Sequence, residues 1–567
     1  MLFFLPSYIS TRVYEKNSEI RSVIVNENDK EFIVLEDNAA LLWKSIVKNE
    51  NEFSAEIIAQ DIKKPIIEIK NFLDELLDIN LISKISEKSF KKKQNNFYLK
   101  NSSGGRYSSG GYNEPAPGGS DLEAEYEMMD WAIDNGFLYS TSWELTYRCN
   151  ERCVHCFNPG ASHVEGDKTF RKVEEIDTKK IIKTLDDLKK IGVFKLMLTG
   201  GEILLRKDLF EILEHVRKQR FSFTIFTNGT LINEDQIQKL KNYYPYRVEL
   251  SVYSHIPEKH DNITRLKNSW NKTMNTALKL KKNGIEVLIK MIVMKDTISD
   301  IAEFQELCKK NDLTAQLDFS MSAGVDGNSY PIKNLLPEPI DLIMESFEIE
   351  SPLNVGTLEK PNSFDAKKSV GQYVCGAGRS GMNISAEGNI SPCNSLPLEY
   401  GNLKNISMSD VWNNSYVGKQ TPVDTRIYSK AKSESTNPSE RLSSWQSVRR
   451  GMYDVCGTFD RCNWCQKCPG LAYLETGSEL KPSTTNCRNA AARMIAYDLL
   501  KEHKDSDTVK KNIDIDKLKL KYNEETALWD PIKNIENNKE ADHKNILLRR
   551  TKPSALEQLL KQEGFLS

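Results

Sequence analysis

The chain has 567 residues, with 78 Lys and Arg against 80 Asp and Glu and a net charge of −2. This balance supplies no positive field for nucleic acid, and a mean hydropathy of −0.52 with no apolar run of about 18 residues excludes a membrane span. Residues 1–9 are apolar but lack the positive flank and cleavage site of a signal peptide, so a cytoplasmic protein is expected. Its 11 cysteines should then stay reduced and serve metal binding or catalysis.

Residues 1–90 predict a small winged-helix module. Two β-branched and apolar runs, 22–25 and 31–35, flank a turn and predict a hairpin. Helical patterns follow, and the last of them begins at Pro65. It places four apolar residues on one face: Ile69, Phe72, Leu73 and Leu76.

A linker and a barrel are expected next. Residues 91–135 are rich in Gly, Pro and Ser and have little apolar surface to bury, which predicts a linker. From 136 to 330, strands alternate with amphipathic helices, as in βα units around a parallel sheet. The fold class is therefore α/β, a partial (βα)6 TIM-like barrel with its site at the carboxyl ends of the strands. The strands are expected at residues 142–147, 194–198, 222–226, 247–252, 287–294 and 316–320.

The alternation of strands and helices stops in residues 365–495, where cysteines, glycines and turns dominate. A segment of this kind needs metals in place of a large apolar core. Residues 496–567 are charged and predict a helical tail without a functional signal.

Three cysteines, Cys149, Cys153 and Cys156, directly follow the first barrel strand. Thiolates at this C-x3-C-x2-C spacing can bind three irons of a 4Fe-4S cluster and leave the fourth iron without a protein ligand. A catalytic metal needs such an open position. The alternative is a zinc knuckle that takes His155 as its fourth ligand.

The second barrel strand ends in Thr199, Gly200, Gly201 and Glu202. Two glycines let the backbone approach a ligand closely, and the carboxylate can accept a hydrogen bond from an ammonium group. Since this sequence ends the strand that comes after the cysteine loop, it favours the catalytic cluster over the zinc knuckle.

These motifs resemble those of the radical S-adenosylmethionine (SAM) superfamily over residues 140–325. The resemblance implies that Cys149, Cys153 and Cys156 bind the catalytic cluster, whose open iron is chelated by SAM. One electron from the cluster then cleaves SAM to a 5′-deoxyadenosyl radical, which abstracts hydrogen from an unactivated C–H bond. The implied SAM contacts are His155 at the adenine, where the family usually has an aromatic residue, Gly200, Gly201 and Glu202 at the methionine amino group, and Ser251 at the ribose.

The late cysteines carry a second resemblance. Cys375 and Cys393, with Gly388 between them, resemble the opening of the SPASM domain, an iron–sulfur module appended to radical SAM enzymes. The remainder departs from the usual C-x2-C-x5-C-x3-C pattern and comprises Cys456, Cys462, Cys465, Cys468 and Cys487. Seven thiolates imply two auxiliary 4Fe-4S clusters, with one iron open or bound by a residue such as Asp460. A pair of zinc sites is the alternative.

Residues 1–90 resemble the PqqD-like peptide-recognition element of enzymes that mature ribosomally made peptides. In that family the leader peptide adds as a strand to the edge of the hairpin and packs on the third helix. A winged helix that binds DNA or only another protein is the alternative.

Together these resemblances imply a radical SAM enzyme that modifies a precursor peptide bound through its leader. The expected reaction is hydrogen abstraction followed by formation of an intrapeptide crosslink, while an auxiliary cluster accepts the second electron. The first-choice product is a thioether, and a carbon–carbon or ether bond is the second choice. Oxidation of a residue in a protein partner, epimerisation of a peptide, and a non-catalytic cluster-binding sensor are the alternatives. An electron donor such as flavodoxin or ferredoxin is the other expected partner; nucleic acid and membrane are not.

Overall fold

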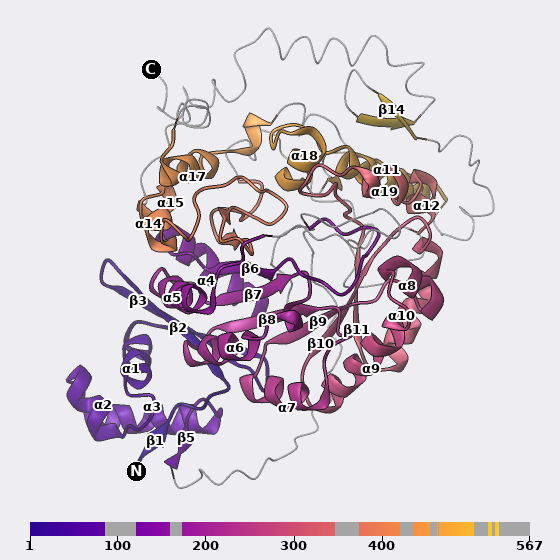
Figure 1. The fold of residues 1–567 in the computed structure, drawn as a ribbon. Helices are drawn as coiled ribbons and strands as arrows, with labels where there is room; N and C mark the ends of the chain where they lie inside the picture. Colours follow the sequence, from indigo (N-terminus) through magenta and orange to yellow (C-terminus); the bar gives the residue numbers. More distant parts are fainter. Residues whose placement is uncertain are drawn as a thin grey trace, which may run out of the picture.

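The structure is a computed structural model that describes residues 1–85, 121–158, 173–345, 373–419, 435–453, 462, 464–465, 467–503, 520–523 and 528–531. Figure 1 shows the N-terminal module (residues 1–85) at the lower left, the barrel (residues 140–318) in the centre and the late cysteine segment (residues 373–503) above it. Within these described ranges, none of the helices has the length and apolar character needed to cross a bilayer.

Six parallel strands form the barrel, and each lies where the sequence predicts a strand. Apolar and polar residues alternate along them, so one face packs on the surrounding helices and the other lines the interior. On the second strand, for example, Leu196 and Leu198 belong to the main apolar core. The strands are β6 Ser140–Thr146, β7 Lys195–Gly200, β8 Ser222–Thr227, β9 Arg247–Ser251, β10 Val287–Ile292 and β11 Thr314–Asp318.

The helices of the barrel bury one apolar face each. In the first of them the Asp177 side chain accepts a hydrogen bond from Lys180 N at 2.8 Å, and Ile181, Leu185 and Leu188 are fully buried. The helices are α5 Thr178–Lys190, α6 Leu209–Lys218, α7 Glu234–Tyr243, α8 Pro257–Thr264, α9 Ser269–Lys282, α10 Ile301–Lys310, α11 Tyr330–Asn334 and α12 Pro339–Glu345, with single 3-10 turns at Ile203–Leu205 and Ile298–Asp300.

The barrel sheet continues into the late cysteine segment. β12 (Gly381–Ile384) lies parallel to β6, with Asn383 opposite Ser142, and β13 (Ile390–Ser391) pairs antiparallel to β12. The eight strands form one sheet in the order β11-β10-β9-β8-β7-β6-β12-β13. The sequence pattern missed β12 because four residues that begin with glycine are too short to show an alternation.

The N-terminal module is an antiparallel sheet, β2-β3-β4, followed by three helices. The expected hairpin corresponds to β3 (Glu19–Asn26) and β4 (Glu31–Glu36). The pattern missed β2 (Ile9–Lys16), because most of its residues are buried and no alternation with polar, exposed positions is visible. The winged-helix assignment stays a prediction. The remaining elements are α1 Asp37–Lys48, α2 Ala55–Ile62, α3 Ile66–Asp78 and the short pair β1 Phe3–Phe4 and β5 Ser83–Lys84.

Two arginines, the buried Arg217 and the half-buried Arg220, hold this module against the barrel. Arg217, near the end of α6, donates to Ser10 Oγ at 3.0 Å and to the carbonyl of Ile9 at 2.7 Å. Arg220 donates to the same carbonyl at 3.0 Å, and its own carbonyl accepts from Thr11 N at 3.0 Å. These bonds occupy the outer edge of β2 and hold the module against the amino ends of the barrel strands.

Arg217→Met is expected to lower the free energy of unfolding by about 1–3 kcal/mol, because Ser10 and the Ile9 carbonyl lose a buried donor. Thermal unfolding of the two variants measures the effect, with the exposed neighbour Lys218→Met as the control. Equal unfolding temperatures for both variants would show that the arginine does not hold the two parts together.

A helix lies inside the stretch expected to be linker. α4 (Asp121–Asp134) packs on the module's sheet, where Met128 and Ala132 are buried in one core with Val25 and with Phe194 of the barrel. The prediction of a linker over 91–135 is therefore wrong for its last third, and the Gly- and Pro-rich part of it lies outside the described residues.

Short helices and turns make up most of the late cysteine segment. They are α14 Met408–Asn413, α15 Tyr416–Lys419, α17 Pro438–Gln446, the 3-10 turn Arg450–Met452, α18 Pro469–Thr476 and α19 Thr484–His503. In the tail expected to be helical, β14 (Leu520–Asn523) and β15 (Leu528–Pro531) form an antiparallel pair, so that expectation is wrong for these residues.

Candidate active site

The cysteine loop begins directly after β6, at the carboxyl end of the barrel strands. Backbone hydrogen bonds tie it to the end of α8: Arg152 N donates to the carbonyl of Thr264 at 2.9 Å, and Val154 N donates to that of Ile263 at 3.0 Å. The position of the loop is therefore set by main-chain contacts that do not depend on a bound group.

The three thiols of this loop lie close enough to affect one another's ionisation. Burial raises the pKa of Cys149 to about 12 and also raises the pKa values of Cys153 and Cys156. The carboxylates of Glu151 and Glu202 add to the rise at Cys149. Metal ligands must be thiolates, so binding of a cluster to this loop should release protons.

This grouping suits a cluster better than a single ion. The cysteines of a cubane each bind a different iron, so their sulfurs surround the cluster and do not meet at one point. Within the described ranges, no three His, Cys, Asp or Glu side chains converge as the ligands of one metal ion. His155, the fourth ligand in the zinc alternative, packs its ring edge-on against Tyr253 at 4.5 Å between centroids. The described residues therefore give the zinc knuckle no support.

Gly200 and Gly201 let the end of β7 lie against the start of the cysteine loop. Gly201 N donates to the carbonyl of Thr146 at 2.7 Å, and Glu202 N donates to that of Arg148 at 2.8 Å. A Cβ on Gly200 would lie 2.3 Å from the Thr146 oxygen, and one on Gly201 would lie 2.3 Å from the Arg148 oxygen. A side chain at either position would push β7 and the cysteine loop apart. The two glycines therefore determine how closely the start of the loop approaches the end of β7.

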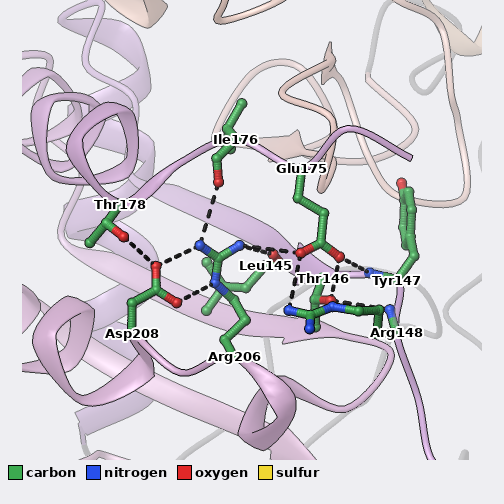
Figure 2. A network of polar contacts seen from close by, with 9 residues as sticks. All are labelled: Leu145, Thr146, Tyr147, Arg148, Glu175, Ile176, Thr178, Arg206 and Asp208. Atoms are coloured by element: carbon green, nitrogen blue, oxygen red, sulfur yellow. Dashed lines mark hydrogen bonds and ion pairs between the residues drawn. The ribbon is translucent and has the colours of Figure 1, made fainter. Parts of the chain in front are cut away.

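A network around Arg206 braces the same end of β6 (Figure 2). Arg206 is bidentate to Asp208, at 2.7 and 3.0 Å, and lies 3.6 Å from Glu175. Glu175 in turn accepts from the Thr146 hydroxyl and, at 3.2 Å, from Tyr147 N. Sequence reasoning missed this network because its members come from three separate segments of the chain and form no local motif.

Glu202 is 0% exposed and joins the end of β7 to the end of β8. Its carboxylate accepts from Leu204 N at 2.9 Å, from Asn228 N at 2.8 Å and from the Thr227 hydroxyl at 2.8 Å. Burial raises its pKa, and these donors oppose the rise. A carboxylate offers about four acceptor positions, so three donors leave one for an ammonium group. The positioning role seen here was not expected, and the contact with SAM stays a proposal.

His155 and Ser251 both contact Tyr253, beside the cysteine loop. The Tyr253 ring packs on His155 and also stacks on His260 at 5.5 Å, and its hydroxyl lies close enough to Ser251 for that side chain to lower the pKa of the phenol. Tyr253 N donates to Nδ1 of His260, and burial lowers the pKa of His260 to about 4, so that ring is neutral at pH 7. The structure thus brings together the residues predicted to contact adenine and ribose.

Three of the late cysteines form one group. The Cys468 thiol lies within electrostatic reach of Cys375 and Cys393, and Cys393 lies within reach of Cys375. Burial raises the pKa of Cys393 to about 11 and that of Cys468 to about 12. Cys468 also caps α18, where its sulfur accepts from Leu471 N at 3.4 Å. The grouping suits one auxiliary cluster, in the same way as at the first loop.

The other late cysteines are Cys456, Cys462, Cys465 and Cys487. Cys465 lies within electrostatic reach of Arg493, and Cys487 is buried in α19. Cys462 is half-buried, and Cys456 lies outside the described residues. Their assignment to a second auxiliary cluster stays a prediction.

Two buried glutamates inside the barrel were missed by sequence reasoning. Burial acts to raise the pKa of Glu249, but Lys290 at 2.8 Å and Arg247 at 2.6 Å outweigh it, so the pKa lies below its ordinary value. Burial raises the pKa of Glu144 to about 7, with Asn383 and Tyr147 as its hydrogen-bond donors. An acidic residue at an interior position of a barrel strand is the signal that would have found both.

Residues 143–308 match the Radical SAM superfamily, and residues 375–469 match SPASM, an iron-sulfur cluster-binding domain. Both domains are therefore present, the chain is an enzyme, and the predicted cofactors, SAM and 4Fe-4S clusters, are confirmed. The PqqD-like element stays a prediction.

Several characterised proteins are similar to this chain. The AdoMet-dependent heme synthase of Methanosarcina barkeri is 25% identical over 361 residues, which cover 60% of this chain and 93% of that protein. The antilisterial bacteriocin subtilosin biosynthesis protein AlbA of Bacillus subtilis is 28% identical over 292 residues, 50% of this chain and 61% of that protein. The PqqA peptide cyclase of Gluconobacter oxydans is 23% identical over 282 residues, 48% of this chain and 75% of that protein.

Solved structures are similar at lower identity. Streptococcus suis SuiB bound to its precursor peptide SuiA has a TM-score of 0.49 and 16% identity, over 86% of this chain and 99% of that chain. The anSMEcpe structure with bound AdoMet has a TM-score of 0.42 and 15% identity, over 66% of this chain and 100% of that chain.

Proposed function

We propose that this enzyme, which carries a radical SAM domain followed by a SPASM domain, matures a ribosomally made precursor peptide by forming an intrapeptide crosslink. The observation that carries the proposal is the N-terminal module, whose sheet has one edge covered by the barrel and one edge free of any described strand. Two relatives support the substrate class, since one is named for bacteriocin biosynthesis and one for cyclising a peptide.

The edge that suits a peptide is β4. β2 is occupied by Arg217 and Arg220, whereas β4 is the last strand of its sheet in the described residues. A free edge offers backbone groups to an extended peptide. Ile33 and Leu35 of β4 are half-buried on the core that α3 also packs against, and α3 leaves Ile67 63% exposed. Apolar side chains of a leader peptide can therefore be buried where its backbone pairs.

At the barrel mouth, Cys149, Cys153 and Cys156 would hold the catalytic cluster, and His155, Gly200, Gly201, Glu202 and Ser251 would hold SAM. The bound pair supplies the 5′-deoxyadenosyl radical. The chain's own residues set the geometry of this site. The two glycines let the cysteine loop lie against β7, and Arg206 and Glu175 stabilise the start of the loop. Glu202 joins the ends of β7 and β8.

The late cysteines, Cys375, Cys393, Cys456, Cys462, Cys465, Cys468 and Cys487, would hold the auxiliary clusters. These residues would thereby supply an acceptor for the second electron of the crosslinking reaction, which removes two hydrogens from the peptide. We propose a thioether as the crosslink, and a carbon–carbon or ether bond is the alternative. A flavodoxin or ferredoxin would supply the electron that starts each turnover.

The test is the accurate mass of a leader-bearing precursor peptide, encoded beside this gene, after anaerobic co-expression with the enzyme. Loss of two hydrogens per event supports the proposal. An unchanged mass with deuterium uptake in heavy water would indicate epimerisation, and an unchanged mass without uptake would contradict peptide modification. Fragmentation of the product identifies the joined residues.

Leu35→Lys and Ile67→Lys are each expected to weaken binding of the leader peptide by roughly tenfold or more, because a charge placed beside the edge opposes apolar burial and strand pairing. Fluorescence anisotropy of a labelled leader peptide measures this. Leu278→Lys on α9, a 39% exposed apolar residue, is the matched control. Unchanged affinity in both module variants would place the leader elsewhere.

A further inference from the structure

Arg379 is a buried cation in the turn between Cys375 and β12, and it is only 3% exposed. All of its hydrogen bonds go to backbone carbonyls. The acceptors are those of Cys375 at 3.1 Å, Trp445 at 3.0 Å, Gln446 at 3.2 Å and Val448 at 2.9 Å. The guanidinium therefore holds the turn after Cys375 against the end of α17.

None of these contacts neutralises the charge. In the described part of the chain, the ionisable groups that act on Arg379 most strongly are the Cys375 thiol and the phenols of Tyr373 and Tyr453, with no carboxylate among them. The Tyr373 ring lies 4.1 Å from the guanidinium carbon. An arginine stays protonated, and a buried charge without a counter-ion is costly. The described groups with the largest effect on Arg379 thus include no carboxylate, and the site suits an anionic group bound beside Cys375.

Cys149 and Cys375, the first thiol of each site, differ in the sign of the charged side chains that act on them. At the first loop, Glu151 and Glu202 act on Cys149 in the direction that disfavours further negative charge. At the late group, Arg379 and Arg450 act on Cys375 in the direction that favours it. The other thiols have mixed neighbours, since Arg152 acts on Cys156 and Glu144 acts on Cys393. The contrast therefore lies between Cys149 and Cys375.

We propose that Arg379 is the counter-ion of the auxiliary cluster held by Cys375, Cys393 and Cys468, and that its fixed charge raises the reduction potential of this cluster. One-electron reduction adds one negative charge to a buried site, and a nearby cation stabilises the reduced form. The carboxylates at the catalytic loop act in the opposite direction. A raised reduction potential suits this cluster to accept an electron.

The test is a redox titration of the reconstituted full-length enzyme, with dithionite as reductant, mediators present and the clusters followed by electron paramagnetic resonance. Arg379→Gln should move the midpoint potential of one auxiliary signal to a more negative value and leave the SAM-responsive signal in place. Arg379→Lys, which keeps the charge, should stay nearer to the wild type. Full iron content with unchanged potentials in Arg379→Gln would overturn the proposal.

A substitution of the more exposed Arg450 tests the same proposal if Arg379→Gln fails to fold or loses iron. Arg450 is half-buried, donates to the carbonyl of Tyr373 at 3.4 Å and also acts on Cys375. Arg450→Gln should shift the same signal in the same direction by a smaller amount, because water screens a more exposed charge. Arg441→Gln on α17, whose guanidinium faces Tyr400, is the matched control. Identical midpoint potentials in Arg450→Gln and Arg441→Gln would overturn the proposal.

Discussion

Replacing Cys149, Cys153 and Cys156 together by Ala is expected to reduce 5′-deoxyadenosine formation from SAM to the level of an enzyme-free control. The three thiols follow directly on β6, and Cys149 and Cys153 each lie within electrostatic reach of Cys156. Anaerobic incubation with SAM and dithionite, followed by chromatography, measures the product. The variant should also contain about four fewer irons per chain than the wild type.

The matched control is Cys308→Ala. Cys308 is buried in α10 away from both cysteine groups, and burial raises the pKa of its thiol to about 12, as it does at Cys149. This variant should keep its iron and its 5′-deoxyadenosine formation. Persistent product formation in the triple variant would contradict the assignment of the catalytic cluster to this loop.

The parts of the fold that were predicted from the sequence are those with local signals. The six barrel strands alternate along the chain with amphipathic helices, a pattern that the residues of each segment already show. The cysteine loop and the Gly200-Gly201-Glu202 motif were found because their spacing is fixed along the chain. In each case, neighbouring residues alone determine the structure.

The parts that were missed depend on contacts between distant segments. β12 becomes a strand because β6 is beside it, and β2 is buried because the barrel covers its outer edge through Arg217. The ion pair between Arg206 and Glu175 joins two loops. The proposed role of Arg379 depends on its closeness to Cys375 in the folded chain. A single sequence shows these charges but not which of them are buried together.

Glu202→Gln is expected to weaken SAM binding by roughly 10–100-fold and to lower the free energy of unfolding by about 1–3 kcal/mol, although the side chains have the same shape. Oε1 of Glu202 faces the N–H of Leu204, and Oε2 faces the N–H of Asn228. A glutamine has only one oxygen. In either orientation its amide N–H would face a backbone N–H in a site closed to water, so the two strand ends could not keep their present spacing.

Calorimetry with SAM and thermal unfolding separate the two roles of this carboxylate, with the exposed Glu234→Gln as the control. If Glu202 only bound the ligand, Glu202→Gln would lose affinity without losing stability. Thr227→Val removes a donor to the carboxylate and leaves the carboxylate itself in place, so a loss of SAM affinity there would come from positioning. We expect both variants to lose affinity and stability together, because the end of β7 is held next to the cysteine loop through the same hydrogen bonds. Unchanged stability in Glu202→Gln would contradict this positioning role.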